Sequence, residues 1–169
     1  MHRCTTPEQV ASAVAEQRAR VVAVDGFQAS GKTTLARALG AALGCKVISA
    51  DQYLHRNRDA FFPHLDLKRL AEDVGTAGTC ILEGVCCLQV LRVIGGTPNC
   101  LVYVKRMAAS RWVDEDALET YTTQGLPPLT EPIDPLAKSL RALWEEVARY
   151  HTQFSPHVVA QVVYERGAA

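Results

Sequence analysis

The sequence between residues 26 and 33 reads Gly26-Phe27-Gln28-Ala29-Ser30-Gly31-Lys32-Thr33, and the organisation of the whole chain follows from it. It matches the phosphate-binding pattern G-x-x-x-x-G-K-[ST] at every fixed position. The preceding residues 21–24 are apolar and mostly β-branched, which is typical of a buried strand. Apolar residues recur at helical spacing over 34–43, and Gly44 then favours a helix end. Strand, glycine-containing loop and helix form the context that this pattern requires.

The residue types of this loop suit the phosphates of a nucleotide. Glycines let the backbone curl so that its N–H groups surround a phosphate, and the following helix adds its positive N-terminal end. Lys32 supplies charge for the outer phosphates, and the Thr33 hydroxyl suits Mg²⁺. The residues expected to contact the nucleotide are Gly26, Gln28, Ala29, Ser30, Gly31, Lys32, Thr33 and Thr34. The pattern by itself does not separate kinases from GTPases or motors, and a glycine turn that binds nothing is the alternative.

The composition predicts one domain over residues 1–169, with 18 acidic and 18 basic residues. This balance argues against dedicated nucleic-acid binding, which normally shows a basic excess. The chain has no apolar run of membrane-spanning length, and residues 1–20 have no signal-peptide core. We therefore expect a cytoplasmic protein with no membrane partner. The six cysteines have no C-x-x-C spacing, so we do not expect them to bind a metal.

Two further apolar segments each lead to an acidic residue. Residues 45–51 end at Asp51, and residues 79–85 contain Glu83. The carboxyl ends of parallel strands share the edge at which open α/β sheets bind ligands. A carboxylate there could accept the proton of a substrate hydroxyl or hold Mg²⁺. Asp51 is therefore the candidate base, and Thr33, Glu83 and Asp51 are the candidate metal ligands. Capping of the next turn is the alternative for Asp51.

Basic residues follow a fourth predicted strand, 99–104. Lys105 and Arg106 come directly after it, and Arg111 lies one or two helical turns further along. Positive charge at this edge could stabilise the charge on a transferred phosphoryl group. We therefore place Arg106 and Arg111 with Lys32 and Asp51 among the candidate catalytic residues. Each arginine could equally form a surface ion pair.

The other segments are less specific. Residues 52–65 form a polar and aromatic loop, whose arginines could contact an anionic substrate or lie in solvent. Residues 104–133 are expected to include a lid and a mobile, proline-rich loop. A long amphipathic helix is predicted from Pro135 to about Gln153, and a last strand over residues 158–164.

The alternation of strands and helices predicts an α/β fold with a mainly parallel sheet and helices on both faces. Parallel strands would bring Gly26, Asp51, Glu83 and Arg106 to one edge, although they are far apart in the sequence. An anion clamp, support for Mg²⁺, a carboxylate that activates a hydroxyl, and neutralising cations are the set that phosphoryl transfer needs.

Over most of residues 20–165 the chain resembles the uridine kinase and phosphoribulokinase group of P-loop kinases. The similar segments are Gly31-Lys32-Thr33-Thr34-Leu35-Ala36, Ser49-Ala50-Asp51-Gln52-Tyr53, Pro63-His64-Leu65-Asp66, Leu82-Glu83-Gly84-Val85 and His157-Val158-Val159-Ala160-Gln161-Val162-Val163. The resemblance implies a three-layer P-loop nucleoside triphosphate hydrolase fold with five parallel strands in the order 2-3-1-4-5. It also implies ATP and Mg²⁺ as cofactors, and phosphorylation of a small-molecule hydroxyl with Asp51 as the base.

The chain departs from this group at Gln52, where the group usually has a second acid. The acceptor could accordingly be a nucleoside, a sugar, a vitamin precursor or an antibiotic hydroxyl. A regulatory module that binds ATP without transferring phosphate is the alternative, because the missing acid permits it. A GTPase should show Asp-x-x-Gly and Asn-Lys-x-Asp after later strands, and the sequence has neither.

Overall fold

A six-stranded parallel sheet forms the centre of the computed structural model, which describes residues 1–55, 61–125 and 135–167, and the side chains of the last range from residue 138. The strands lie in the order β1-β7-β5-β2-β4-β3. Their bounds are His2–Cys4 for β1, Val162–Arg166 for β7, Cys100–Ala108 for β5, Val21–Gly26 for β2, Cys80–Glu83 for β4 and Lys46–Ser49 for β3. All neighbours in this order pair in parallel.

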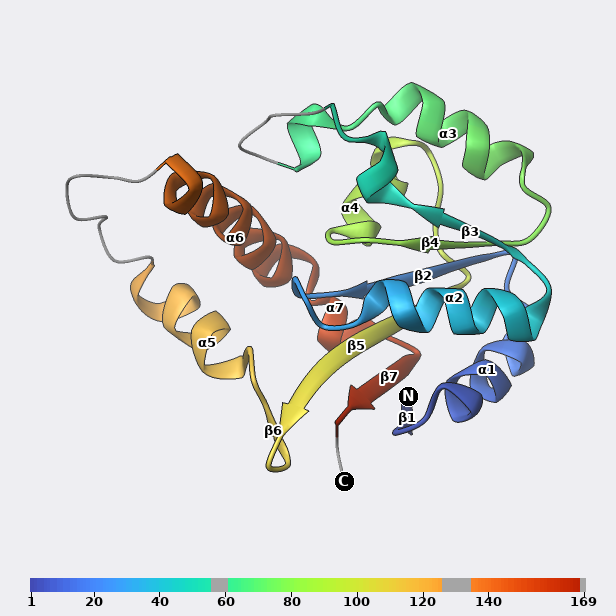
Figure 1. Cartoon of the computed structure of the whole chain (residues 1–169), viewed down its shortest axis with the longest axis horizontal. Helices are drawn as coiled ribbons and strands as arrows, with labels where there is room; N and C mark the ends of the chain where they lie inside the picture. The colour runs from blue at the N-terminus through green and yellow to red at the C-terminus, as the bar shows by residue number, and fades with distance from the viewer. Residues whose placement is uncertain (56–60, 126–134, 168–169) are drawn as a thin grey trace.

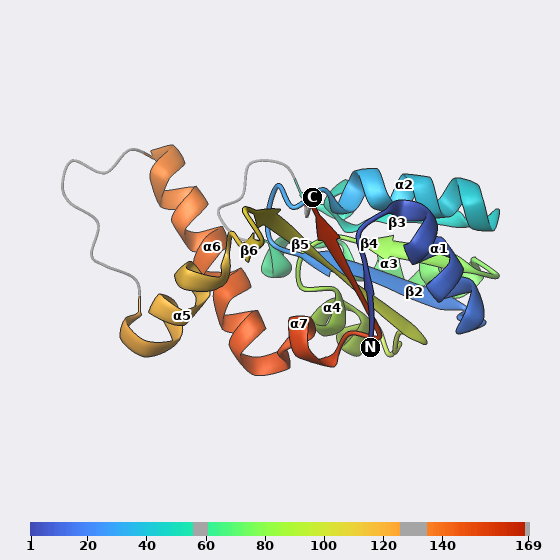
Figure 2. The ribbon, with the colours of Figure 1, turned by 90° about the horizontal axis from the view of Figure 1, so that it is seen from below.

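Helices cover both faces of the sheet, which gives three layers (Figures 1 and 2). The helices α1 (Pro7–Glu16) and α2 (Lys32–Leu43) pack on one face, where alternate strand residues such as Val22 and Val24 join their core. Helices α3 (Leu67–Thr76), α4 (Cys87–Val93) and α6 (Pro135–Phe154) contribute to the core on the other face, which contains Ala23. The two cores follow from the alternation of side chains along each strand.

The predicted strand order is confirmed. Numbered along the sequence, the five predicted strands correspond to β2, β3, β4, β5 and β7, and they occur in the order 2-3-1-4-5. The count of five was wrong, because β1 adds a parallel strand beside β7, and the short β6 (Arg111–Trp112) pairs antiparallel with β5. Neither addition shows periodicity in the sequence, since the segments have only three and two residues.

Two predicted boundaries were also wrong. Strand β5 runs through Ala108, so Arg106 lies within the strand. In the register of the sheet its backbone lies beside that of Arg166 in β7. The first residues of the predicted last strand belong instead to a short helix, α7 (Pro156–Val159). Pro156 occupies its first turn, where the fixed backbone angle of proline favours a helix start.

The connections between these elements contain short helices. The 3-10 helices η1 (Ala50–Tyr53) and η2 (Phe62–His64) interrupt the segment predicted as a loop, and α5 (Glu115–Gln124) follows β6. Residues 56–60 and 126–134 are outside the described part of the chain, so the predicted mobile loop falls largely there. Within the described residues, no helix combines the length and apolar character needed to cross a lipid bilayer.

Candidate active site

A cavity of about 530 Å³ lies beside the loop that joins β2 to α2. Its described lining is Gln28, Ala29, Gly31, Lys32, Thr33, Thr34, Asp51, Leu54, Phe61, Glu83, Val85, Ser139, Leu140 and Leu143. Lys32, Asp51 and Glu83 follow or end three different strands, and the structure brings all three to this cavity. Gly26 and Ser30 are part of the same loop but do not line the cavity.

The loop backbone requires glycine at two positions. Gly26 has φ +150°, and a Cβ atom there would lie 2.6 Å from the carbonyl oxygen of Val104. Gly31 has φ +100°, and a Cβ atom there would lie 2.9 Å from the side chain of Arg166. The positive φ disfavours larger residues at both positions. At Gly26 the backbone of Val104 also leaves no space for a Cβ atom, whereas at Gly31 the contact is with the flexible side chain of Arg166. Lys32 lies against this loop, with its Nζ donating a hydrogen bond of 2.6 Å to the carbonyl oxygen of Phe27.

Glu83 presents a carboxylate oxygen that no described residue satisfies. The Thr33 hydroxyl donates to Glu83 Oε2 at 3.2 Å, whereas Glu83 Oε1 is buried and has no hydrogen-bond partner among the described residues. Buried polar atoms in native structures are nearly always satisfied. An unpaired carboxyl oxygen next to a threonine hydroxyl therefore points to a cation or a bound water at this position.

Asp51 is the first-turn acid of η1, directly after strand β3. The residue is exposed, and partial burial of its carboxyl group together with the negative charge of Glu83 raises its pKa, while Lys32 acts in the opposite direction. An exposed carboxylate with a raised pKa is suited to accept a proton and release it to water.

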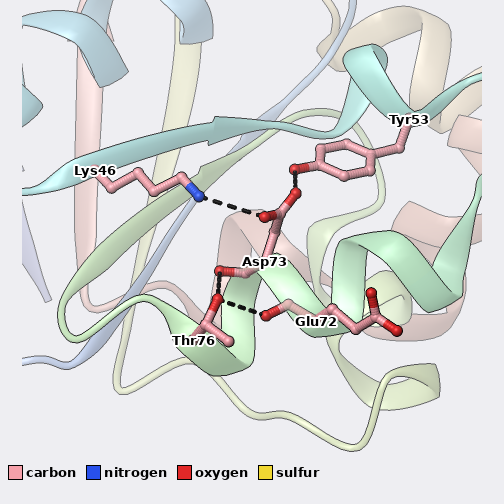
Figure 3. A network of polar contacts seen from close by, with 5 residues as sticks. All are labelled: Lys46, Tyr53, Glu72, Asp73 and Thr76. Atoms are coloured by element: carbon pink, nitrogen blue, oxygen red, sulfur yellow. Dashed lines mark hydrogen bonds and ion pairs between the residues drawn. The ribbon is translucent and has the colours of Figure 1, made fainter.

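A polar network holds the turn that carries Asp51 (Figure 3). The Tyr53 hydroxyl donates to Asp73 Oδ2 of α3 at 2.5 Å, and Lys46 Nζ lies 3.5 Å from Asp73 Oδ1. Burial, with the neighbouring Asp73 carboxylate, raises the pKa of Tyr53 to about 12, so this phenol remains a hydrogen-bond donor. The network fixes η1 against α3, and thereby restricts the position of Asp51 two residues earlier.

The structure reveals a buried carboxylate directly behind the loop that the sequence analysis missed. Asp25 Oδ1 accepts a hydrogen bond of 2.7 Å from the Gly26 amide, and Oδ2 accepts from the Cys87 amide at 3.0 Å and from the Tyr150 hydroxyl. Burial raises the pKa of Asp25 to about 6, although these donors and Lys32 oppose the shift. Asp25 thus connects β2, α4 and α6. An acid at the end of an apolar strand was the available signal.

Replacement of Tyr150 with phenylalanine is expected to destabilise the fold more at pH 8 than at pH 5. The pKa of Asp25 is raised in the folded state. Protonation of Asp25 therefore contributes to the free energy of unfolding at low pH, and this contribution is lost as the pH rises through about 6. Above that pH the phenol donates to a charged acceptor, which typically contributes ~1.5–3 kcal/mol, against ~0.5–1.5 kcal/mol for a neutral one. Urea unfolding at the two pH values measures the difference.

Tyr103 provides the matched control. Its hydroxyl makes a buried hydrogen bond of 2.7 Å with His151 Nε2, and burial lowers the pKa of His151 to about 4, so this pair stays neutral from pH 5 to 8. Tyr103→Phe should therefore lower the free energy of unfolding by the same amount at both pH values. An equal, pH-independent loss in Tyr150→Phe would contradict the assignment of an ionised Asp25.

The two candidate lid arginines do not line the cavity. Arg106 Nη2 lies 2.8 Å from Asp114 Oδ1, and the exposed Arg111 Nη2 lies 2.9 Å from Asp116 Oδ1. The β5–β6 hairpin directs both towards the start of α5. Their role in phosphoryl transfer stays a prediction, and it would require these ion pairs to open.

Arg166 is a further basic residue at the loop that sequence reasoning missed. It ends strand β7, and its Nη1 donates to the carbonyl oxygen of Ser30 at 3.2 Å. Its side chain also lies against Gly31. Its position at the end of the last strand was the available signal, because that end reaches the same sheet edge.

A solved structure shows the same fold. A possible uridine kinase from Bacillus stearothermophilus superimposes with a TM-score of 0.57 at 16% identity, covering 94% of this chain and 97% of that chain. A shikimate kinase from Acinetobacter baumannii, solved in complex with shikimate, gives a TM-score of 0.49 at 16% identity over 93% and 89% of the two chains. The first likeness establishes that this chain has the fold of the P-loop kinases.

No protein-family model matches the sequence, and no curated protein matches it. The likeness to the possible uridine kinase confirms the expected resemblance to the uridine kinase-like group at the level of the fold.

Proposed function

We propose that the protein transfers the terminal phosphoryl group of ATP to a hydroxyl of a small molecule, with the assistance of Mg²⁺. The observation that carries this proposal is the convergence of Lys32, Asp51 and Glu83 on one cavity beside a phosphate-binding loop. At this cavity Lys32 would clamp the phosphates, Asp51 would accept a proton and Glu83 would bind the metal, which is the set that phosphoryl transfer needs.

The loop from Gly26 to Thr34 would bind the phosphates. Its backbone N–H groups and the start of α2 favour negative charge, and Lys32 would exchange the Phe27 carbonyl oxygen for a phosphate oxygen. Arg166 would support this loop from behind through the Ser30 carbonyl. These contacts would hold the outer phosphates at the cavity that Asp51 also lines.

The residues present fit a magnesium ion. Hard oxygen ligands suit Mg²⁺, and Thr33 and Glu83 offer a hydroxyl and a carboxylate at the cavity, while Asp51 would reach the ion only through a bound water. The unsatisfied Oε1 of Glu83 supports this assignment. The part of the chain that the structure describes has no group of three His, Cys, Asp or Glu side chains arranged for a metal, so phosphate oxygens and water would complete the coordination. When bound, Mg²⁺ neutralises charge on the phosphoryl oxygens.

Asp51 would act as the base. As the acceptor oxygen forms its bond to the γ-phosphorus, the bond from that phosphorus to the bridging oxygen breaks and ADP leaves. The proton of the acceptor hydroxyl passes to the Asp51 carboxylate, and then to water. The raised pKa of Asp51 makes it a stronger base than an ordinary aspartate.

The proposal is tested by measuring ADP release with Mg²⁺ against nucleosides, sugars, vitamins and aminoglycosides. We expect ADP to form in step with a phosphorylated product when an acceptor is present. In single-turnover experiments, ATP that binds but is never transferred to any acceptor would instead indicate a regulatory nucleotide-binding module.

A further inference from the structure

A single carboxylate joins two walls of the cavity on the side away from the phosphate loop. Phe61, directly before η2, lines one of these walls, and Leu143 of α6 lines the other. The Glu146 side chain of α6 accepts hydrogen bonds from the backbone amides of Phe61 at 2.8 Å and Phe62 at 2.7 Å. We propose that Glu146 is a positioning residue, which holds the Phe61 segment where it contacts the acceptor. The inference rests on the proposed transfer to a hydroxyl and assigns a residue to the acceptor half of the same site.

Glu146 lies on the same face of α6 as Leu143. It follows Leu143 by three residues, and residues at this spacing are neighbours on a helix surface. Its Oε2 accepts from the Phe61 amide, and its Oε1 accepts from the Phe62 amide. Hydrogen bonds to a carboxylate are stronger than those between neutral groups. Glu146 therefore holds the segment against α6 with both of its oxygens.

Phe61 extends from this contact to the end of strand β4. Its side chain is buried, and a Cβ atom on Gly84 would lie 3.9 Å from Phe61 Cζ. Gly84 directly follows Glu83, the candidate metal ligand. The position of Phe61 therefore limits the cavity between α6 and the strand end that carries Glu83.

The same segment is paired with the turn that carries Asp51. Leu65 forms an antiparallel bridge with Leu54, and the Asp66 amide donates to the carbonyl oxygen of Tyr53 at 2.8 Å. Leu54 lines the cavity three residues after Asp51. A segment that is held at α6 thus also restricts Leu54, so one carboxylate acts on two residues of the acceptor wall.

Without this contact, a bound acceptor would itself have to order the segment. The apparent affinity of a ligand falls in proportion to the fraction of molecules in the binding-competent arrangement. Once the acceptor is bound, the arrangement is restored, so the rate at saturation changes little. The phosphate loop has a separate support, since Arg166 donates to the Ser30 carbonyl oxygen. The expected signature is therefore a change in the KM of the acceptor alone.

Replacement of Glu146 with glutamine tests the inference, because the amide keeps the size of the side chain but has one oxygen to accept with. Uridine, D-ribose, pyridoxine and kanamycin serve as acceptor probes, and ADP release is measured with each probe that is phosphorylated. We expect the KM of the acceptor to rise ~10-fold, while kcat and the KM of ATP stay within about twofold. Hydrogen exchange at the Phe61 and Phe62 amides should become faster.

Glu145→Gln is the matched control, because it makes the same change one residue earlier on α6. The Glu145 carboxylate lies 3.8 Å from Arg149 in a solvent-accessible ion pair and does not line the cavity. Such pairs contribute little to stability. The control should leave both KM values and the exchange of the Phe61 and Phe62 amides unchanged. Thermal unfolding of the two variants checks that the fold persists.

The outcomes separate this inference from the proposed function. An unchanged acceptor KM in Glu146→Gln would overturn the inference and leave the transfer activity standing. A lower kcat at an unchanged KM, or an equal rise in the KM of ATP, would also overturn it, because neither is specific to acceptor binding. No ADP release by the unmodified protein with any of these probes would overturn the transfer activity, and this inference with it.

Discussion

Replacement of Asp51 with asparagine is expected to reduce turnover by ~10²–10⁴-fold, the usual contribution of a general base, while ATP binding is retained. Asparagine keeps the size of the side chain but cannot accept the proton of the acceptor hydroxyl. Asp51 lines the cavity at the end of β3 and does not belong to the phosphate-binding loop, so the contacts to the nucleotide should survive. Initial rates and ATP titration measure the two effects separately.

The pH profile gives a second readout for Asp51. Because the carboxylate form is the active one, activity of the unmodified protein should rise with pH through the raised pKa of Asp51, and Asp51→Asn should lack this limb. Glu16→Gln makes the same carboxylate-to-amide change on an exposed position of α1, and should leave rate and profile unchanged. Full activity in Asp51→Asn would remove its assignment as the base.

Replacement of Lys32 with alanine is expected to weaken ATP binding and slow transfer together, by ~10²–10³-fold in kcat/KM, which is typical for loss of one electrostatic group in an active site. The Lys32 side chain is only 7% exposed and reaches across the loop to Phe27. The positive charge of Lys32 would attract the outer phosphates of bound ATP. It would also stabilise the negative charge that is distributed over the phosphoryl oxygens in the transition state. Both binding and turnover therefore depend on it.

Arg37→Ala is the control for Lys32→Ala, because it removes one positive charge from an exposed position of the same helix. It should leave ATP affinity and turnover close to those of the unmodified protein. Thermal unfolding of both variants checks that the fold persists. Normal turnover in Lys32→Ala would be incompatible with phosphate binding by this loop.

The local signals of the sequence were sufficient for the centre of the fold. The loop between Gly26 and Thr33 has a fixed pattern, and the strands around it are short apolar runs with acids at their ends. Parallel pairing then determines that Asp51 and Glu83 reach the loop, because all carboxyl ends share one edge. The sequence pattern alone was therefore enough to propose Thr33, Glu83 and Asp51 as metal ligands, without knowledge of any side-chain contact.

The contacts that depend on distant segments could not be predicted. Asp25 is held by Tyr150, which lies 125 positions away, and Ser30 is held by Arg166, 136 positions away. The sequence shows Glu146 only as a charged residue of an amphipathic helix. In the structure its carboxylate accepts hydrogen bonds from the backbone amides of Phe61 and Phe62. Such partners are determined by packing, which leaves no periodicity in the sequence.

The pairing of β1 with β7 has a consequence for how the chain is synthesised. His2 pairs with Val162, and β7 also completes the hydrogen bonding of β5. During translation β1 therefore has no partner until the segment that contains Val162 has left the ribosome. Contacts so distant in sequence slow folding, and unpaired strand edges expose nascent chains to aggregation. This architecture gives the emerging protein a long interval in which chaperones can act.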